Sequence, residues 1–393
     1  MKKRHPYRNP DEIPDPSIVL TPRERQVLQL VVEGCKNREM ADRMRITLKT
    51  VEKHRKNLMD KLRVHNVPEL FRVVVKYGLI DTDTIPAHAL GTVKFIGQCD
   101  SPGIAKGVAV RGRYSYLGGG SGGLRIIDVG KPAVPRLVGT YRTDGDAMGL
   151  TVIRNLVYLA DQARGLKIID VTDPAHPVLT GHYIQQVSED ERWAVDVALQ
   201  AGFAYIAYDF LGLHIVDVRN PAAPQFVKGL GAQNWSREFF PAGRYGYHVQ
   251  HTAGLVVIEI SEPSSARRIG SLNLPGNPMG VFAVGQYAYV AAYDGGLHIV
   301  NVSAPSNPTL VSTCAMPGLA HRVMVSGRYA YVAAGPGGVH ILDISDSAAP
   351  HWVGTCKTLG SANDLSVSNR LIYVADGTVG LVILQFAPPL EVR

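Results

Sequence analysis

A phrase of seven residues recurs along the chain, and this repeat restricts the possible folds more than any other feature of the sequence. Each copy begins with glycine and continues with a mostly apolar run: GLRIIDV at 123, GLKIIDV at 165, GLHIVDV at 212, GLVVIEI at 254, GLHIVNV at 296, GVHILDI at 338 and GLVILQF at 380. Successive copies begin 42 residues apart, except for one interval of 47 residues between the second and third copies. A tyrosine stands seven residues before every opening glycine, so a whole structural unit is repeated rather than a short motif.

Each unit carries the pattern of four short β-strands. Apolar and polar residues alternate in segments of the type AxGVxV, YAYVA, GLxIVDV and LVGTY, and Gly- and Pro-rich turns separate them. Four strands in one unit make a propeller blade, so the seven units predict a seven-bladed β-propeller. The region begins with a lone fourth strand at 92–99 and ends with a third strand at 381–386, and pairing of these ends would close the ring without an open edge. The units resemble LVIVD repeats, and this resemblance implies the fold but little agreed chemistry.

The positive charge of the chain is concentrated in one short region. The net charge is +7, and residues 20–80 hold 14 Lys and Arg against 7 Asp and Glu, whereas residues 81–393 have a net charge of −1. A basic module attached to a near-neutral body is the electrostatic pattern of a nucleic-acid-binding protein. A merely soluble surface would give the same charge, so charge alone does not decide between them.

The sequence shows no sign of a membrane or secretory location. It contains no apolar run of about 18 residues, and its basic first residues are not followed by an apolar segment, so we expect neither a membrane span nor a signal peptide. The four cysteines form no CxxC pair, which is typical of a reduced, cytoplasmic protein.

The basic region contains the start and stop signals of several helices. Thr21 is an expected N-cap, Pro22 suits the first helical position and Glu24 completes a capping box. A second short helix has an apolar side formed by Met40, Ala41 and Met44. A fourth helix is predicted over VPELFRVVVKYGL, with Gly78 as its C-cap.

The third helix, within ITLKTVEKHRKNLMDKL, is basic and amphipathic, and Thr47 is its expected N-cap. Its helical spacing predicts a buried stripe of Val51, Leu58 and Leu62. The opposite face then presents Lys49, Glu52, Lys53, Lys56 and Asp60. Two short helices joined by a tight turn, the second of them basic, predict a helix-turn-helix.

This region resembles the LuxR/FixJ-type helix-turn-helix domain over about 60 residues. The residues that carry the resemblance are Leu20, Thr21, Arg23, Glu24, Val27, Leu28, Gly34, Asn37, Glu39, Ala41, Thr50, Val51, His54, Asn57, Lys61, Leu62, Gly78, Leu79 and Ile80. The resemblance implies a bacterial regulator whose third helix reads double-stranded DNA. It also implies a homodimer that pairs through residues 67–77 on an inverted repeat.

The resemblance assigns roles to individual residues. Lys53 and Lys56 occupy the positions that face base edges, whereas Arg38 and Lys49 are placed to contact phosphates. Glu52 departs from the family, in which Lys is frequent at this position, and a carboxylate there would accept from cytosine N4. The complete set of expected DNA-binding residues is Arg38, Lys49, Thr50, Glu52, Lys53, Lys56 and Asn57.

The predicted architecture is therefore multidomain, α followed by all-β. It consists of a flexible arm (1–19), a small four-helix helix-turn-helix domain (20–80), a linker (81–90), a seven-bladed β-propeller (91–387) and a tail (388–393). Because so few residues precede the helix-turn-helix, we expect the input domain of this regulator to lie downstream, in the propeller.

Comparison of the seven units with one another points to a candidate ligand site in the propeller. Just before the innermost strand, three blades carry glycine or methionine where the others carry charged or polar residues that should ring one mouth of the central channel. These residues are Asp196, Arg237, Glu238, His321, Arg322 and Asp364. Solvated salt bridges in a water-filled channel are an equally good interpretation of the same pattern.

The sequence as a whole predicts a DNA-binding transcriptional regulator whose propeller senses a small ligand or docks a protein. The first alternative is an interaction scaffold in which the helical domain binds protein. The second is a propeller enzyme, but no Ser/His/Asp order, HExxH motif or carboxylate pair stands out, so we expect no catalytic residue, no metal and no cofactor.

Overall fold

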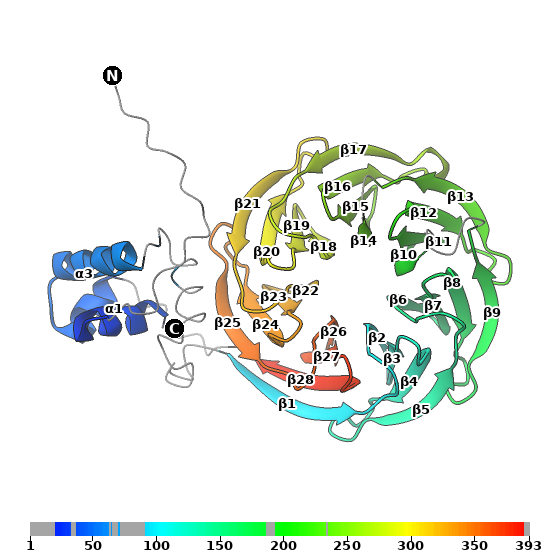
Figure 1. The fold of residues 1–393 in the computed structure, drawn as a ribbon, viewed down its shortest axis with the longest axis horizontal. Coiled ribbons are helices and arrows are strands. Elements are labelled where there is room, and N and C mark those ends of the chain that lie inside the picture. Colours follow the sequence, from blue (N-terminus) through cyan, green and yellow to red (C-terminus); the bar gives the residue numbers. More distant parts are fainter. Residues whose placement is uncertain are drawn as a thin grey trace. The chain divides into compact units, whose positions relative to one another are not determined.

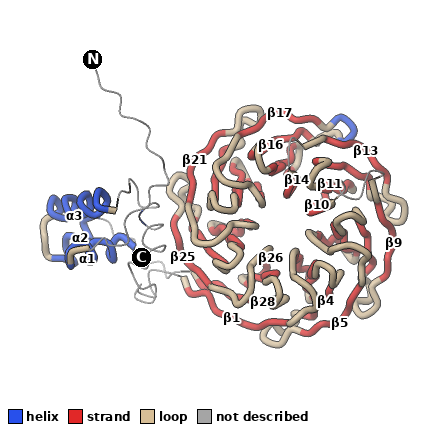
Figure 2. Tube along the Cα trace, in the orientation of Figure 1, coloured by secondary structure: helices blue, strands red, loops and turns tan. Residues whose placement is uncertain are grey.

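The chain folds into two separate compact units, residues 1–89 and residues 90–393, and each is described by itself. The computed structural model describes residues 20–32, 37–62, 64, 70, 91–185, 193–232 and 235–388 (Figure 1). Helices form the first unit and strands form the second, apart from one short 3₁₀ segment, η3 (Pro263–Ser265) (Figure 2). The boundary between the units falls within the predicted linker.

Three helices are described in the first unit: α1 (Pro22–Val32), α2 (Asn37–Met44) and α3 (Leu48–Lys61). The predicted capping box opens α1, because the Thr21 amide donates to Glu24 Oε2 at 2.8 Å and the Glu24 amide donates to Thr21 Oγ1 at 3.2 Å. Thr47 caps α3 as predicted, since its hydroxyl accepts from the Thr50 amide at 3.2 Å. These bonds satisfy backbone donors that a helix start leaves unpaired.

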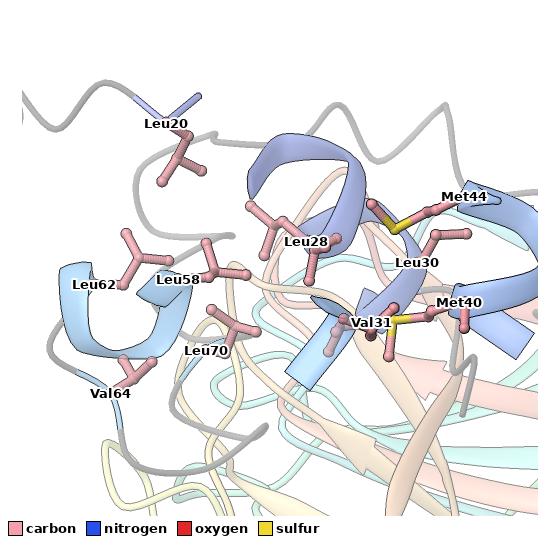
Figure 3. Close-up of a cluster of buried hydrophobic side chains, with 13 residues drawn as sticks. Leu20, Leu28, Leu30, Val31, Met40, Met44, Leu58, Leu62, Val64 and Leu70 are labelled. Atoms are coloured by element: carbon pink, nitrogen blue, oxygen red, sulfur yellow. The ribbon is translucent and has the colours of Figure 1, made fainter. Parts of the chain in front are cut away.

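The helices enclose one apolar core, part of which is drawn in Figure 3. Val51 and Leu58 of α3 are completely buried, and Leu62 is 1% exposed, which confirms the predicted stripe. Met40, Ala41 and Met44 supply the contribution of α2, again as predicted.

Several predictions about this unit concern residues outside the described part of the chain. The fourth helix, predicted over 67–79, is described only at Leu70, which is buried. The described part therefore has three helices, and the four-helix domain and the pairing segment 67–77 stay predictions. The predicted arm, the linker before Gly91 and the tail after residue 388 also lie outside the described residues.

The second unit contains seven four-stranded antiparallel sheets, which confirms the seven-bladed propeller. The first three blades are β2 (Gly107–Arg111), β3 (Tyr114–Gly118), β4 (Leu124–Asp128) and β5 (Arg136–Tyr141); β6 (Leu150–Ile153), β7 (Leu156–Ala160), β8 (Leu166–Asp170) and β9 (Val178–Tyr183); and β10 (Ala194–Gln200), β11 (Phe203–Tyr208), β12 (Gly212–Asp217) and β13 (Gln225–Leu230). The next three are β14 (Ser236–Ala242), β15 (Tyr245–Gln250), β16 (Gly254–Glu259) and β17 (Arg267–Leu272); β18 (Gly280–Val284), β19 (Tyr287–Ala291), β20 (Leu297–Asn301) and β21 (Thr309–Cys314); and β22 (Arg322–Ser326), β23 (Tyr329–Ala333), β24 (Val339–Asp343) and β25 (His351–Cys356).

The seventh blade is built from both ends of the repeat region. It contains β26 (Asp364–Ser368), β27 (Leu371–Ala375), β28 (Leu381–Ala387) and, as its outer strand, β1 (Thr92–Cys99). β1 pairs with β28 from Thr92 opposite Ala387 to Cys99 opposite Leu381. This pairing closes the ring as predicted and leaves no gap between first and last blades (Figure 1).

The residues of the repeat are those that neighbouring blades need in order to pack. Apolar side chains of adjacent sheets share one core: Tyr289 and Ile299 of the fifth blade belong to the same cluster as Val323 and Leu342 of the sixth. The glycine of LVGTY lets an outer strand approach the Pro-containing loop of the next blade. A Cβ on Gly139, for example, would lie 1.8 Å from the Pro174 carbonyl oxygen.

Candidate nucleic-acid interface and propeller channel

The turn between α2 and α3 orients the basic helix. Arg45 adopts a left-handed conformation with φ of 52°, and the Ile46 amide donates to the Ala41 carbonyl at 3.1 Å. A left-handed residue ends a helix sharply, so the chain reverses within the three residues before α3. The two helices and their short turn form the predicted helix-turn-helix.

Basic residues occupy the exposed face of α3. Lys49, Lys53 and Lys56 are exposed, and none of them forms an ion pair within the described part of the chain. Glu52 and Asn57 are exposed beside them, and so is Arg38 on α2. This face is therefore rich in donors, with two carboxylates, Glu52 and Asp60, among them.

One predicted DNA contact has a second role. Thr50 is half-buried, and its hydroxyl lies 2.8 Å from Thr47 Oγ1, so it takes part in the N-terminal cap of α3. A phosphate contact from Thr50 would compete with this hydrogen bond.

Two polar contacts that the sequence did not reveal hold α3 in place. Arg55 Nη1 donates to Asn37 Oδ1 at 2.7 Å and joins α3 to the start of α2. Lys61 Nζ pairs with Glu24 Oε2 at 2.9 Å and joins the end of α3 to the start of α1. Burial raises the pKa of Glu24, but the hydrogen bonds from Thr21 and Lys61 outweigh burial and hold the pKa below its usual value.

A shallow groove of about 360 Å³ runs beside α3. Its lining includes Glu52, Lys56 and Asp60 of the exposed face together with Asn37 and Val64. Two of the predicted DNA-binding side chains therefore border a hollow rather than a flat surface.

In the propeller, four of the six predicted channel residues come together. Asp196, Glu238, Arg322 and Asp364 come from the innermost strands of the third, fourth, sixth and seventh blades. Arg322 Nη1 lies 2.7 Å from Glu238 Oε1 and 3.8 Å from Asp196 Oδ2, and Arg322 Nε lies 3.2 Å from Asp364 Oδ1. One guanidinium thus faces three carboxylates from three other blades.

Two of these carboxylates also join their blade to the next one. Glu238 Oε2 accepts from the Val281 amide at 3.0 Å, and Asp364 Oδ2 accepts from the Val108 amide at 2.8 Å. Val108 lies in the first blade and Asp364 in the seventh, so this bond joins the first and last blades. The channel cluster therefore ties blades together.

Burial controls the ionisation of the channel cluster. It raises the pKa of Asp196 to about 6, although Arg322 acts in the opposite direction, and it also raises the pKa values of Glu238 and Asp364. Burial alone would lower the pKa of Arg322, but the three carboxylates outweigh it and raise that pKa.

The remaining two predicted channel residues have other partners. Arg237 Nη1 lies 3.1 Å from Asp209 Oδ1, and its guanidinium lies 5.4 Å from the centre of the Trp235 ring. His321 packs edge-on against Tyr293 with ring centres 5.3 Å apart, and burial lowers its pKa. The six residues do not form one cluster, because Arg237 is the extra residue of a register shift between Ser236 and Glu238 and His321 lies just before the first residue of β22.

The fourth blade contains a serine–histidine pair that the sequence did not reveal. Ser236 Oγ lies 2.6 Å from His248 Nε2, and Gln250 Nε2 lies 3.1 Å from His248 Nδ1. All three residues are completely buried, and burial lowers the pKa of His248 to about 3. With no exposed surface on Ser236, this arrangement is a buried hydrogen-bond chain rather than an accessible nucleophile.

No cluster of three or more His, Cys, Asp or Glu suited to hold a metal ion occurs among the residues described. Within the same ranges, no helix is both long and apolar enough to cross a membrane.

The fold and the exposed basic helix define a class: a helix-turn-helix module joined to a seven-bladed repeat propeller. The chain belongs to the LVIVD-repeat family, whose repeat matches residues 102–143, 144–185, 191–229, 242–273, 275–316, 317–358 and 359–385. Residues 18–74 match a second family, described as bacterial regulatory proteins of the luxR family. Both predicted resemblances, and the fusion of the two, are confirmed.

Similar proteins are regulators that share only a short region with this chain. Oxygen regulatory protein NreC of Staphylococcus carnosus is 37% identical over 67 residues, which are 17% of this chain and 31% of that protein. The uncharacterized response regulatory protein YgeK of Escherichia coli is 43% identical over 60 residues, 15% of this chain and 41% of that protein. Transcriptional regulatory protein MctR of Rhizobium johnstonii is 40% identical over 70 residues, 18% of this chain and 33% of that protein. The chain thus spans less than half the length of these curated relatives.

Solved structures share the propeller fold. The WD40 β-propeller domain of Doa1 matches with a TM-score of 0.60 at 11% identity, over 76% of this chain and 97% of that one. The WD40 repeats of RRP9 match with a TM-score of 0.59 at 9% identity, over 75% and 97%. At such low identity these likenesses show the fold alone.

Proposed function

We propose that the chain is a transcriptional regulator that binds double-stranded DNA through α3 and uses the propeller as a sensing or protein-docking module. The observation that carries this proposal is the exposed face of α3, where three lysines have no ion-pair partner among the described residues. Unpaired cations on a helix of this kind are available to neutralise phosphates and to donate to bases.

The roles proposed for individual residues follow from their chemistry. Lys53 and Lys56 would donate to guanine O6 and N7, and Glu52 beside them would accept from cytosine N4. Arg38 and Lys49 would contact phosphates and set the register of the helix on the duplex. Pairing of two copies through residues 67–77 and a cytoplasmic location are part of the same proposal.

The propeller is proposed as the input module, with no catalytic role. The channel cluster favours a stabilising function over anion binding, because Arg322 already has three carboxylate partners. The predicted ligand role of the channel mouth then rests on Arg237 and His321, which lie outside this cluster.

Selection from random DNA duplexes with the full-length chain tests the proposal. The unmodified protein should enrich one motif, and Lys53→Ala/Lys56→Ala should lose that enrichment while melting at the same temperature. The matched control is Lys94→Ala/Lys131→Ala, which removes the same charge from exposed positions on the propeller and should retain the motif.

The same experiment separates the regulator from the protein-binding scaffold. Binding to the selected duplex should weaken steeply with salt, because each neutralised phosphate releases counterions. If no motif is enriched, or if the Lys53→Ala/Lys56→Ala protein binds as well as the unmodified chain, the DNA-binding proposal is wrong and the scaffold becomes the better interpretation.

A further inference from the structure

A groove of about 460 Å³ lies on the propeller where the fourth blade meets the fifth. Its walls come from the β14–β15 hairpin, the end of β16, the start of β17 and the loop between β20 and β21. β17 and β21 are consecutive outer strands of the ring (Figure 1). None of the six predicted channel residues lines this groove, which we call the rim groove.

Comparison of the blades shows that this groove carries extra positive charge. In the first and sixth blades, one arginine of the inner hairpin pairs with one carboxylate at the end of the third strand: Arg113 with Asp128 at 2.6 Å and Arg328 with Asp343 at 2.5 Å. In the fourth blade, Arg244 makes the equivalent pair with Glu259 Oε1 at 2.6 Å, but Arg267 also pairs with Glu259 Oε2 at 2.6 Å. A single carboxylate therefore serves two arginines.

A third arginine, Arg268, departs from the pattern of all the other blades. Its partner in the sheet is Ile258, and the residues at the equivalent outer-strand position are apolar in each of the other blades: Phe95, Leu137, Leu179, Phe226, Leu310 and Trp352. Arg268 is exposed, and within the described residues it donates to the Gly231 carbonyl and forms no ion pair. With three arginines and one glutamate, the groove has a formal charge of +2.

Apart from Ser306, the remaining wall is apolar and aromatic. Tyr245, Ile269 and Pro305 line it, and the Arg244 guanidinium lies 5.7 Å from the centre of the Tyr245 ring. Arginine is well suited to phosphate because its planar fork forms two parallel hydrogen bonds with phosphate oxygens. The volume is within the range of pockets that hold one small organic ligand.

We propose that this rim groove binds the phosphate group of a small phosphorylated molecule, with Arg267 and Arg268 as the phosphate ligands and Tyr245 beside the organic part. Arg244 stays paired with Glu259 and shapes the wall. The site is separate from the channel mouth, and the proposal does not depend on whether the channel residues bind a ligand.

The test is calorimetric titration of the full-length chain with pyrophosphate and with AMP, each at constant ionic strength set by chloride. One molecule should bind per chain, and Arg268→Leu should weaken binding by about tenfold, or about 1.4 kcal/mol. Leucine is the residue that the first, second and fifth blades carry at this position, so the variant should fold. Arg267→Ala/Arg268→Leu should abolish saturable binding.

Arg113→Ala is the matched control, because it removes one arginine from a pair in a blade without surplus charge. Binding that is equally reduced by Arg113→Ala would show a general charge effect and overturn the proposal, as would unchanged binding by the double variant. Absence of saturable binding of both probes at about 10 mM would also overturn it. Lys53→Ala/Lys56→Ala protein lacks the proposed DNA contacts of α3. If a short DNA duplex displaces pyrophosphate from this variant, the groove binds nucleic acid and the proposal of a small phosphorylated ligand is wrong.

Discussion

The basic face of α3 and the arginine of the propeller channel are opposite uses of positive charge in one chain. Lys53 and Lys56 are exposed and have no ion-pair partner in the described ranges, whereas Arg322 is surrounded by three carboxylates that are at most 8% exposed. An exposed cation keeps its hydration and can exchange it for a ligand at little cost. The Arg322 side chain is 29% exposed, but its three carboxylate partners are nearly buried and need a cation beside them, because desolvation of an unpaired charge is expensive.

The contrast teaches that a charged position in a repeat is informative only once its partners are known. Asp196, Glu238, Arg322 and Asp364 satisfy one another and leave little free capacity for a ligand. The exposed lysines of α3 retain that capacity, and under our proposal so do Arg267 and Arg268 of the rim groove. Stability experiments and binding experiments should therefore respond to different members of this set.

The largest expected effect is on stability, from Arg322→Ala. Removal of this guanidinium leaves three buried carboxylates without their counter-ion, and breaking such a cluster costs about 3–5 kcal/mol of the free energy of unfolding. Urea denaturation measures this loss of free energy, and scanning calorimetry of the propeller transition checks it. Arg113→Ala, which breaks an exposed pair, should leave the transition unchanged, and an equally small effect of Arg322→Ala would mean that the channel cluster is not stabilising.

The next effect is on binding, from Lys53→Ala/Lys56→Ala. Loss of two base contacts should lower affinity for the selected duplex by about 100-fold, with little change in unfolding free energy because both side chains are exposed. Fluorescence anisotropy with a labelled duplex measures this. A variant that loses stability along with affinity would show that these lysines hold the helical unit together, which would remove the contrast with Arg322.

A large part of both regions could be predicted from the sequence, for identifiable reasons. The propeller followed from one signal repeated in every blade, and the caps at Thr21 and Thr47 followed from local rules that tertiary contacts did not override. The convergence of Asp196, Glu238 and Arg322 could be predicted because equivalent positions of innermost strands face the same axis.

What failed was prediction of side-chain partners. Arg237 pairs with Asp209, which lies on a different blade, and Ser236 meets His248 only because β14 and β15 are adjacent. In the sequence, Arg268 stands out as one arginine where the other blades carry apolar residues. The excess positive charge of the groove depends also on Arg244, Arg267 and Glu259, which the fold brings together from separate segments.

A third prediction uses pH to separate the two regions. Burial raises the pKa of Asp196 to about 6, above the value of about 3.9 for an unfolded chain, so the folded state binds a proton more tightly. The stability from this group is present at low pH and is lost as pH rises from about 4 to about 6. For Glu24 in the helical unit, whose pKa is lowered, the sign is reversed, and stability is lost as pH falls.

Asp196→Asn isolates this contribution, since asparagine mimics the protonated acid. As pH rises from about 4 to about 6, the free energy of unfolding of the propeller should fall in the unmodified chain relative to Asp196→Asn. Glu238 and Asp364 face the same site and titrate with it, whereas Arg322 stays charged, so the comparison is made with all three intact. A difference that is independent of pH would show that folding does not raise the pKa of Asp196.

The smallest expected effect distinguishes free from paired lysines within α3 itself. Lys49 is exposed without an ion-pair partner in the described residues, whereas Lys61 is bound to Glu24 at 2.9 Å. Lys49→Ala should weaken binding to all duplexes alike and reduce the slope of log affinity against log salt by about 1, as expected for a lost phosphate contact. Lys61→Ala should leave that slope unchanged, because the Lys61 ammonium is already paired with Glu24. If both variants change the slope equally, ion pairing does not decide which lysines of α3 reach DNA, and the distinction must come from position along the helix.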